Sequence, residues 1–139
     1  MYKAETFIKV RYYETDLMGV VHHSNYIRYF ECGRDDALVK IGLSLTQVED
    51  ELGVMMPVIK VECTYKIPAK YGDTLRIIST ITELPKVKII VNTDIFNQNN
   101  ELVCTGSVTL AFISKKTRKT TRAPELLVKS FAPFFKETT

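Results

Sequence analysis

The feature that most constrains the fold of this chain is an apolar segment of helical period at residues 26–41, because most other apolar segments alternate with polar residues. Apolar or small side chains recur there at intervals of three and four residues, which places them on one face of a helix. The members of that face are Tyr26, Phe30, Gly33, Ala37 and Ile41, and Ile27, Tyr29 and Leu38 widen it. A face this wide predicts a largely enclosed helix. Ser24 or Asn25 can cap its first turn, and Gly42 suits the position past its end.

Alternating apolar and polar residues predict strands in much of the remaining chain. The expected strands cover residues 6–13, 60–66, 75–81, 87–95 and 102–113. A short helix is expected at residues 46–52, where Thr46 and Glu49 have capping-box spacing, and another is expected from Pro124. This order indicates an α+β fold in which the long helix lies across an antiparallel sheet, since no other predicted element could cover it. No repeat or linker divides the chain, so we expect one domain over residues 1–139.

Composition excludes several classes of protein. The net charge of +3 is too small to indicate nucleic-acid binding, and no apolar run approaches the length of a membrane span. A strand pattern begins almost at residue 1, which leaves no room for a signal peptide. The three cysteines, Cys32, Cys63 and Cys104, suggest neither a disulfide framework nor a zinc site, so we expect reduced thiols in the cytoplasm. No feature suggests a metal or redox cofactor.

The segment from residue 11 to residue 34 contains the pattern Tyr-x-x-Thr-Asp-x-x-Gly-Val-Val-x-His-x-Asn-Tyr, starting at Tyr12. This pattern resembles the signature of the 4-hydroxybenzoyl-CoA thioesterase family, in its short acyl-CoA thioesterase branch. The resemblance implies a hotdog fold, with a five-stranded sheet wrapped around the long helix, and the hydrolysis of acyl-CoA thioesters. It also implies a homodimer joined along the strand at residues 58–65, with active sites at the interface, and often a homotetramer.

Carried over residue by residue, the resemblance places the catalytic carboxylate on Asp16. It places the backbone N–H that polarises the thioester carbonyl on His23. The substrate-binding residues that it implies are Gly19, Val20, His22, Asn25 and Tyr26. Physical chemistry supports the placement, because a thioester hydrolase needs a carboxylate that attacks or activates water, and a helix N-terminus offers unpaired N–H donors to an oxyanion.

Other interpretations of these residues remain open. Asp16 by itself is typical of a turn carboxylate, and His23 of a capping or packing histidine. Glu31 is expected to be a buried carboxylate near the middle of the long helix, or an acid of another hotdog subfamily. Leu17 and Met18 stand where relatives often have small residues, which would make the acyl slot tighter or more apolar.

The basic cluster near the end of the chain also has two interpretations. Its members are Lys115, Lys116, Arg118, Lys119 and Arg122. Such a run is typical of a solvated hairpin tip. It could instead hold the phosphates of CoA, or meet the acidic surface of an acyl carrier protein if the enzyme acts on that thioester. A non-catalytic hotdog dimer that binds acyl ligands is the alternative from another class, and Asp16 argues against it.

Overall fold

The structure is a computed structural model that describes residues 1–135. Its elements in chain order are β1 (Tyr2–Lys9), the 3-10 turn η1 (Tyr12–Glu14), α1 (Ser24–Val39), α2 (Leu45–Asp50), β2 (Val54–Met55), β3 (Val58–Tyr65), β4 (Thr74–Ile81), β5 (Lys88–Phe96), β6 (Leu102–Ala111), β7 (Ile113–Ser114), α3 (Glu125–Phe131) and the 3-10 turn η2 (Ala132–Phe135). Within these residues, no helix is both long enough and apolar enough to cross a membrane.

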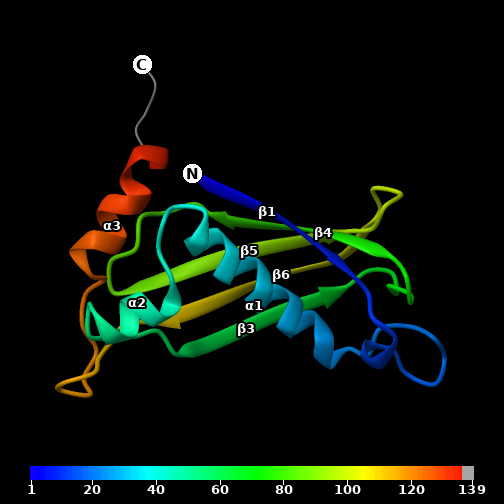
Figure 1. Cartoon of the computed structure of the whole chain (residues 1–139), viewed down its shortest axis with the longest axis horizontal. Coiled ribbons are helices and arrows are strands. Elements are labelled where there is room, and N and C mark those ends of the chain that lie inside the picture. Colours follow the sequence, from blue (N-terminus) through cyan, green and yellow to red (C-terminus); the bar gives the residue numbers. More distant parts are fainter. Residues whose placement is uncertain (136–139) are drawn as a thin grey trace.

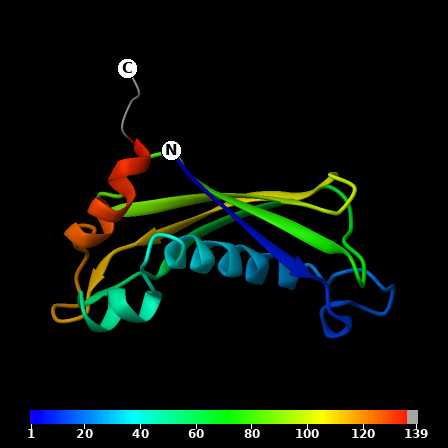
Figure 2. The ribbon, with the colours of Figure 1, turned by 45° about the horizontal axis from the view of Figure 1, so that its top comes forward.

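The main sheet has five antiparallel strands in the order β1-β4-β5-β6-β3 (Figure 1). It curves over α1, which lies along its concave face (Figure 2). Alternate side chains of β4 and β5 are buried against the helix, as the period-two pattern predicts. This arrangement is the hotdog fold, so the predicted fold class is confirmed. β3 lies at one edge of the sheet and pairs only with β6 among the strands of residues 1–135.

The helix lies close to the sheet because Gly33 has no side chain. A Cβ atom at this position would lie 2.7 Å from both Ile77 Cγ2 and Ser79 Oγ on β4. One turn earlier on the same face, Phe30 is fully buried. The small residue in the helical pattern therefore marks the point of closest approach between α1 and β4.

Several expected boundaries and caps were wrong, each for a local reason. The first strand covers residues 2–9, not 6–13, because the Glu14 side chain accepts the Arg11 N–H at 2.8 Å and the chain turns there. The long helix begins at Ser24, so neither Ser24 nor Asn25 is its cap. The short helix is capped by Ser44, whose Oγ accepts the Gln47 N–H at 3.0 Å, and the predicted capping box at Thr46 does not form.

The carboxylate that the fold buries is also a different one. Glu31 was expected to be buried in the long helix, but its side chain is 59% exposed, and it lies 4.0 Å from the Arg34 guanidinium. Glu14 is buried instead, at the turn before the helix. The helical period did not reveal that Glu31 is exposed, because this residue lies at the border of the buried face of α1. It gave no information on Glu14, which precedes the helix.

Candidate active site

The segment that carries the predicted signature folds back on itself as a short ladder before α1. The His22 N–H donates to the Glu14 carbonyl at 2.9 Å, and the Asp16 N–H donates to the Val20 carbonyl at 2.8 Å. Gly19 at the tip has a φ of +78°, a conformation that other residues rarely adopt. The ladder therefore presents Asp16, Gly19 and Val20 at its tip, with His22 and His23 at the entrance to the helix.

A second set of contacts fixes this ladder to the turn before β4. The Val21 N–H donates to the Ala69 carbonyl at 2.8 Å. In return, the Ala69 N–H donates to the Tyr26 hydroxyl at 3.2 Å, and both residues are buried. Burial is the main cause that raises the pKa of Tyr26 above its ordinary value, so the phenol stays protonated at neutral pH.

Asp16 is exposed, and one of its carboxylate oxygens stabilises its own loop. Oδ1 accepts the Met18 N–H at 2.8 Å and lies 3.4 Å from the Val20 nitrogen. No hydrogen bond to the other oxygen, Oδ2, is made within residues 1–135. The turn role foreseen for this carboxylate is therefore present, and it leaves one oxygen free to act on a ligand. Leu17 and Met18 are exposed beside it.

The entrance to α1 has an unpaired donor. The His22 ring, not a serine or asparagine side chain, accepts a hydrogen bond from the first turn of α1. Its Nδ1 accepts the Ser24 N–H at 3.2 Å and lies 2.8 Å from Ser24 Oγ. His23 precedes the helix, and its side chain makes no capping hydrogen bond. Its backbone N–H has no acceptor within residues 1–135. The donor thus lies at the positive end of the helix dipole.

Asn25 has a structural task that the sequence did not reveal. Its side chain is buried, and Nδ2 donates to the Glu14 carbonyl at 2.8 Å. This bond joins the first turn of α1 to the start of the ladder. Asn25 Nδ2 and the Tyr26 hydroxyl are therefore both used to hold the loop, while the ring of Tyr26 remains available as a wall of the neighbouring groove.

Beside the helix entrance lies an open groove of about 270 Å³, lined by Val21, His23, Tyr26, Tyr65 and neighbouring residues of the loop after β3. The Tyr65 hydroxyl donates to the His23 carbonyl at 3.3 Å, which joins β3 to the helix entrance. Asp16 does not line this groove. A single chain thus brings the predicted site residues onto one loop and the first helical turn, but does not enclose them.

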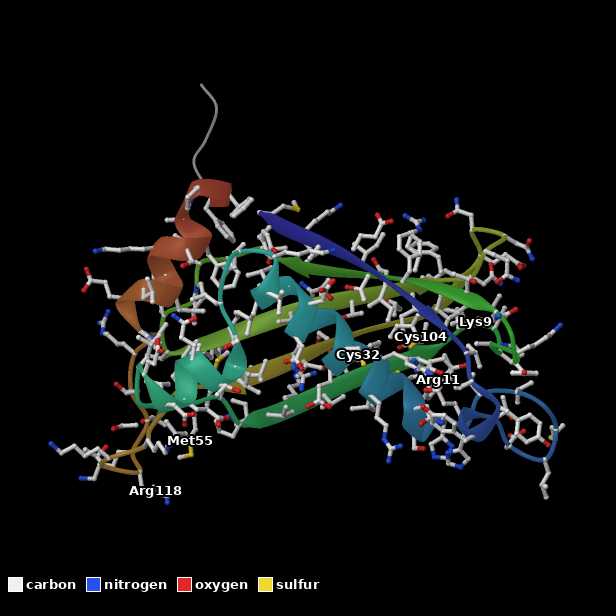
Figure 3. All side chains as sticks on the ribbon, in the orientation of Figure 1. Lys9, Arg11, Cys32, Met55, Cys104 and Arg118 are labelled. Carbon is white, nitrogen blue, oxygen red and sulfur yellow. The ribbon has the colours of Figure 1, made fainter. Side chains whose placement is uncertain are left out.

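The basic cluster lies at the opposite end of the molecule. Lys115 to Lys119 form the turn after β7, and Arg118 appears beside Met55 in Figure 3, far from Arg11 near the ladder. Lys115 Nζ lies 3.4 Å from Asp50 Oδ1. Within one chain, therefore, these cations are not at the rim of the groove beside His23.

Comparison with known proteins identifies the family. Residues 10–131 match the model of the thioesterase-like superfamily. YneP of Bacillus subtilis (strain 168), whose name as an acyl-CoA thioesterase is provisional, is 31% identical over 119 residues, which cover 86% of each chain. YbgC of Helicobacter pylori (strain ATCC 700392 / 26695), named an acyl-CoA thioesterase, is 29% identical over 126 residues, covering 85% of this chain and 92% of its own. The structure of a DHNA-CoA thioesterase from Staphylococcus aureus superposes with a TM-score of 0.83 at 29% identity, over 99% of this chain and 98% of that one.

The fold and the signature loop define a hotdog protein of the thioesterase class. The chain belongs to the thioesterase-like superfamily. The family and enzyme class predicted from the motif are thereby confirmed, while the roles of individual residues stay predictions.

Proposed function

We propose that this protein hydrolyses acyl-CoA thioesters to a free acid and CoA. The observation that supports this most directly is the presence, on one loop, of the Asp16 carboxylate and the His23 N–H at the helix entrance, because Oδ2 and this N–H make no hydrogen bond in the described part of the chain. Relatives that match over most of their length are named for acyl-CoA hydrolysis. Those names favour CoA over an acyl carrier protein as the carrier of the acyl group.

In the proposed mechanism, the thioester carbonyl oxygen accepts the N–H of His23. The helix dipole and this donor stabilise the negative charge that develops there. Asp16 then either takes a proton from the attacking water or attacks the carbonyl carbon itself. In both routes the C–S bond breaks and CoA leaves as a thiolate, which then takes up a proton. The attack by Asp16 forms an anhydride that water hydrolyses in a second step. His22 and the loop at Gly19 and Val20 border the thioester in this arrangement.

We also propose that two copies pair through β3. Its exposed apolar side chains, Val58, Ile59, Val61 and Tyr65, are 43%, 60%, 40% and 49% exposed, which is unfavourable for an unpaired edge. Antiparallel pairing of β3 with its copy would continue the sheet and cover them. Static light scattering at micromolar concentration should give the mass of a dimer or tetramer, and a stable monomer would contradict this assembly.

The antiparallel pairing has a consequence for the basic cluster. One end of β3 lies beside His23 and the other end lies near the turn at Lys115 to Lys119. Pairing would bring the basic turn of one copy beside the helix entrance of the other. We therefore assign CoA phosphate binding to the basic turn of the partner.

The decisive experiment is the Asp16→Asn substitution, assayed by thiol release from a panel of short, long and aromatic acyl-CoAs. Asparagine keeps an oxygen that accepts the Met18 N–H, so the loop should persist while the charged oxygen is lost. We expect turnover to fall by about 10²–10⁴-fold. Asp94→Asn, whose carboxylate bonds Thr105 on the outer face of the sheet, is the matched control and should keep full activity. Near wild-type turnover of Asp16→Asn would refute the mechanism.

A further inference from the structure

A second cavity lies between α1 and the concave face of the sheet, at the opposite end of α1 from the signature loop. Its volume is about 170 Å³, and most of its wall is apolar, including Leu38, Met56, Ile89, Val91 and Leu110. An apolar cavity of roughly 150 Å³ is large enough to hold a benzene ring. The cavity can therefore accept a short aliphatic chain or a single ring, which is the size of the acyl part of a small acyl-CoA.

One charged side chain is set deep in this wall. Only 17% of the Arg34 side chain is exposed, and its Nη1 atom is buried without a hydrogen-bond partner in residues 1–135. The nearest carboxylate oxygen, of Glu31, lies 4.0 Å from the other terminal nitrogen, too far for a hydrogen bond. Buried polar groups are normally satisfied, so an unpaired guanidinium N–H beside a cavity indicates a place for a ligand oxygen.

The cavity reaches the edge strand through which the dimer is proposed to form. Val58, at the start of β3, lines it, and Tyr65, at the other end of β3, lines the groove at His23. Antiparallel pairing of β3 places the partner's Tyr65 close to this Val58. A thioester held at the partner's His23 would then direct its acyl group into this cavity.

The charges that line the cavity restrict which oxygen Arg34 can meet. Glu31 and Asp35 also line the cavity, so its ionised groups carry two negative charges against one positive charge. Burial, followed by the charge of Glu31, raises the pKa of Asp35, as expected for a carboxylate that is partly desolvated beside another anion. A terminal carboxylate on the acyl group would add such an anion, whereas a hydroxyl or ketone oxygen would not.

We propose that Arg34 is a specificity residue, which selects acyl groups that carry an uncharged oxygen, a hydroxyl or a ketone, beyond the thioester carbonyl. This inference rests on the proposed hydrolysis of acyl-CoA by a β3-paired dimer. The guanidinium of Arg34 donates to that oxygen inside the cavity. A hydroxyl group can in addition donate its own proton to Glu31 or Asp35, and would then pair with both a cation and an anion of the cavity wall.

The test compares kcat/KM for four acyl-CoAs of equal chain length: hexanoyl-, 6-hydroxyhexanoyl-, 5-oxohexanoyl- and adipoyl-CoA. Wild type should prefer the hydroxyl or ketone substrate over hexanoyl-CoA by roughly 10- to 100-fold, the effect of a hydrogen bond to a charged donor. Arg34→Met, of similar length but without donors, should reduce this ratio to near one. Arg34→Lys, which keeps one charged donor, should give an intermediate ratio. Arg76→Met, on β4 beside Phe96 and away from the cavity, is the control and should keep the wild-type ratio.

A ratio that is the same in wild type and Arg34→Met would overturn the inference, and so would a preference of wild type for adipoyl-CoA. Binding of the same four substrates to Asp16→Asn and to Asp16→Asn/Arg34→Met, measured by calorimetry, separates this result from the proposed function. If wild type hydrolyses none of the four and no member of the short, long and aromatic acyl-CoA panel, the proposed function fails. An affinity ratio that Arg34→Met abolishes would still support the role of Arg34, and an unchanged one would refute it.

Discussion

The substitution Tyr26→Phe tests whether this residue holds the signature loop or meets the substrate with its hydroxyl. The hydroxyl accepts the Ala69 N–H at 3.2 Å, and Tyr26 and Ala69 are only 4% and 0% exposed. Phenylalanine keeps the ring, which packs edge-on against Tyr29 and Tyr65 with centroids 6.0 and 5.2 Å away. What is lost is the acceptor, and the buried N–H of Ala69 is left without a partner.

A buried donor left unsatisfied costs about 1–3 kcal/mol of unfolding free energy. In a chain of this size, that corresponds to a fall in Tm of about 3–6 °C for each kcal/mol. The assay is thermal unfolding followed by circular dichroism, at one fixed protein concentration because dimer stability depends on concentration. Tyr13→Phe, at a position that is 76% exposed, is the control and should have the same Tm as wild type.

Turnover at temperatures well below Tm separates the two roles of Tyr26. If the hydroxyl only holds the loop, folded Tyr26→Phe should hydrolyse acyl-CoA within a few fold of wild type. An unchanged Tm together with a large loss of kcat would refute the structural role and assign the hydroxyl to the substrate.

Two further predictions concern charge. Replacing Lys115, Lys116, Arg118 and Lys119 together by glutamine should raise KM for acyl-CoA and leave kcat nearly unchanged, because phosphate contacts at a rim act on binding. KM for an acyl-pantetheine thioester, which lacks the nucleotide, should not change, and equal effects on both substrates would remove the phosphate role. Alkaline pH should unfold the protein, because burial raises the pKa of Tyr2, Tyr26 and Tyr29 above the ordinary value of 10.0. Their stabilising effect is complete below pH 10 and is lost above it, because the tyrosines of the unfolded chain ionise at lower pH than those of the folded chain. Urea unfolding midpoints should therefore fall from pH 10 upward. A midpoint that does not change with pH in this range would contradict this assignment.

The sequence predicted those parts of the fold that depend on periodicity. The expected helix at 26–41 lies two residues from the observed α1, and the alternation in β4 and β5 matches their burial. Boundaries set by single side chains were missed, because no period reveals which neighbour a polar group will choose. The carboxylate of Glu14 ends the first strand, and the ring of His22 takes the place of the expected serine or asparagine cap.

The residues of the candidate site also divide into those that the sequence predicted and those that it did not. The signature placed Asp16, His23 and their neighbours on one loop because they are adjacent in sequence, and the structure retains that adjacency. Arg34 has no such signal, since its buried Nη1 depends on how α1 lies against strands that follow much later in the chain. The Tyr26 bond to Ala69 likewise joins residues 43 positions apart. Residues whose roles depend on tertiary contacts can be identified only from the structure.

The position of β3 links these observations. One chain holds two incomplete sites, the groove at His23 beside Tyr65 and the cavity at Arg34 beside Val58, at opposite ends of the same edge strand. Parallel pairing of β3 would place like ends together and leave each groove without a cavity. Antiparallel pairing about a two-fold axis would join every groove to a cavity of the other copy, so two complete sites would form at once. The same pairing would cover the exposed apolar residues of β3, so the proposed assembly that protects the sheet edge would also complete the proposed enzyme.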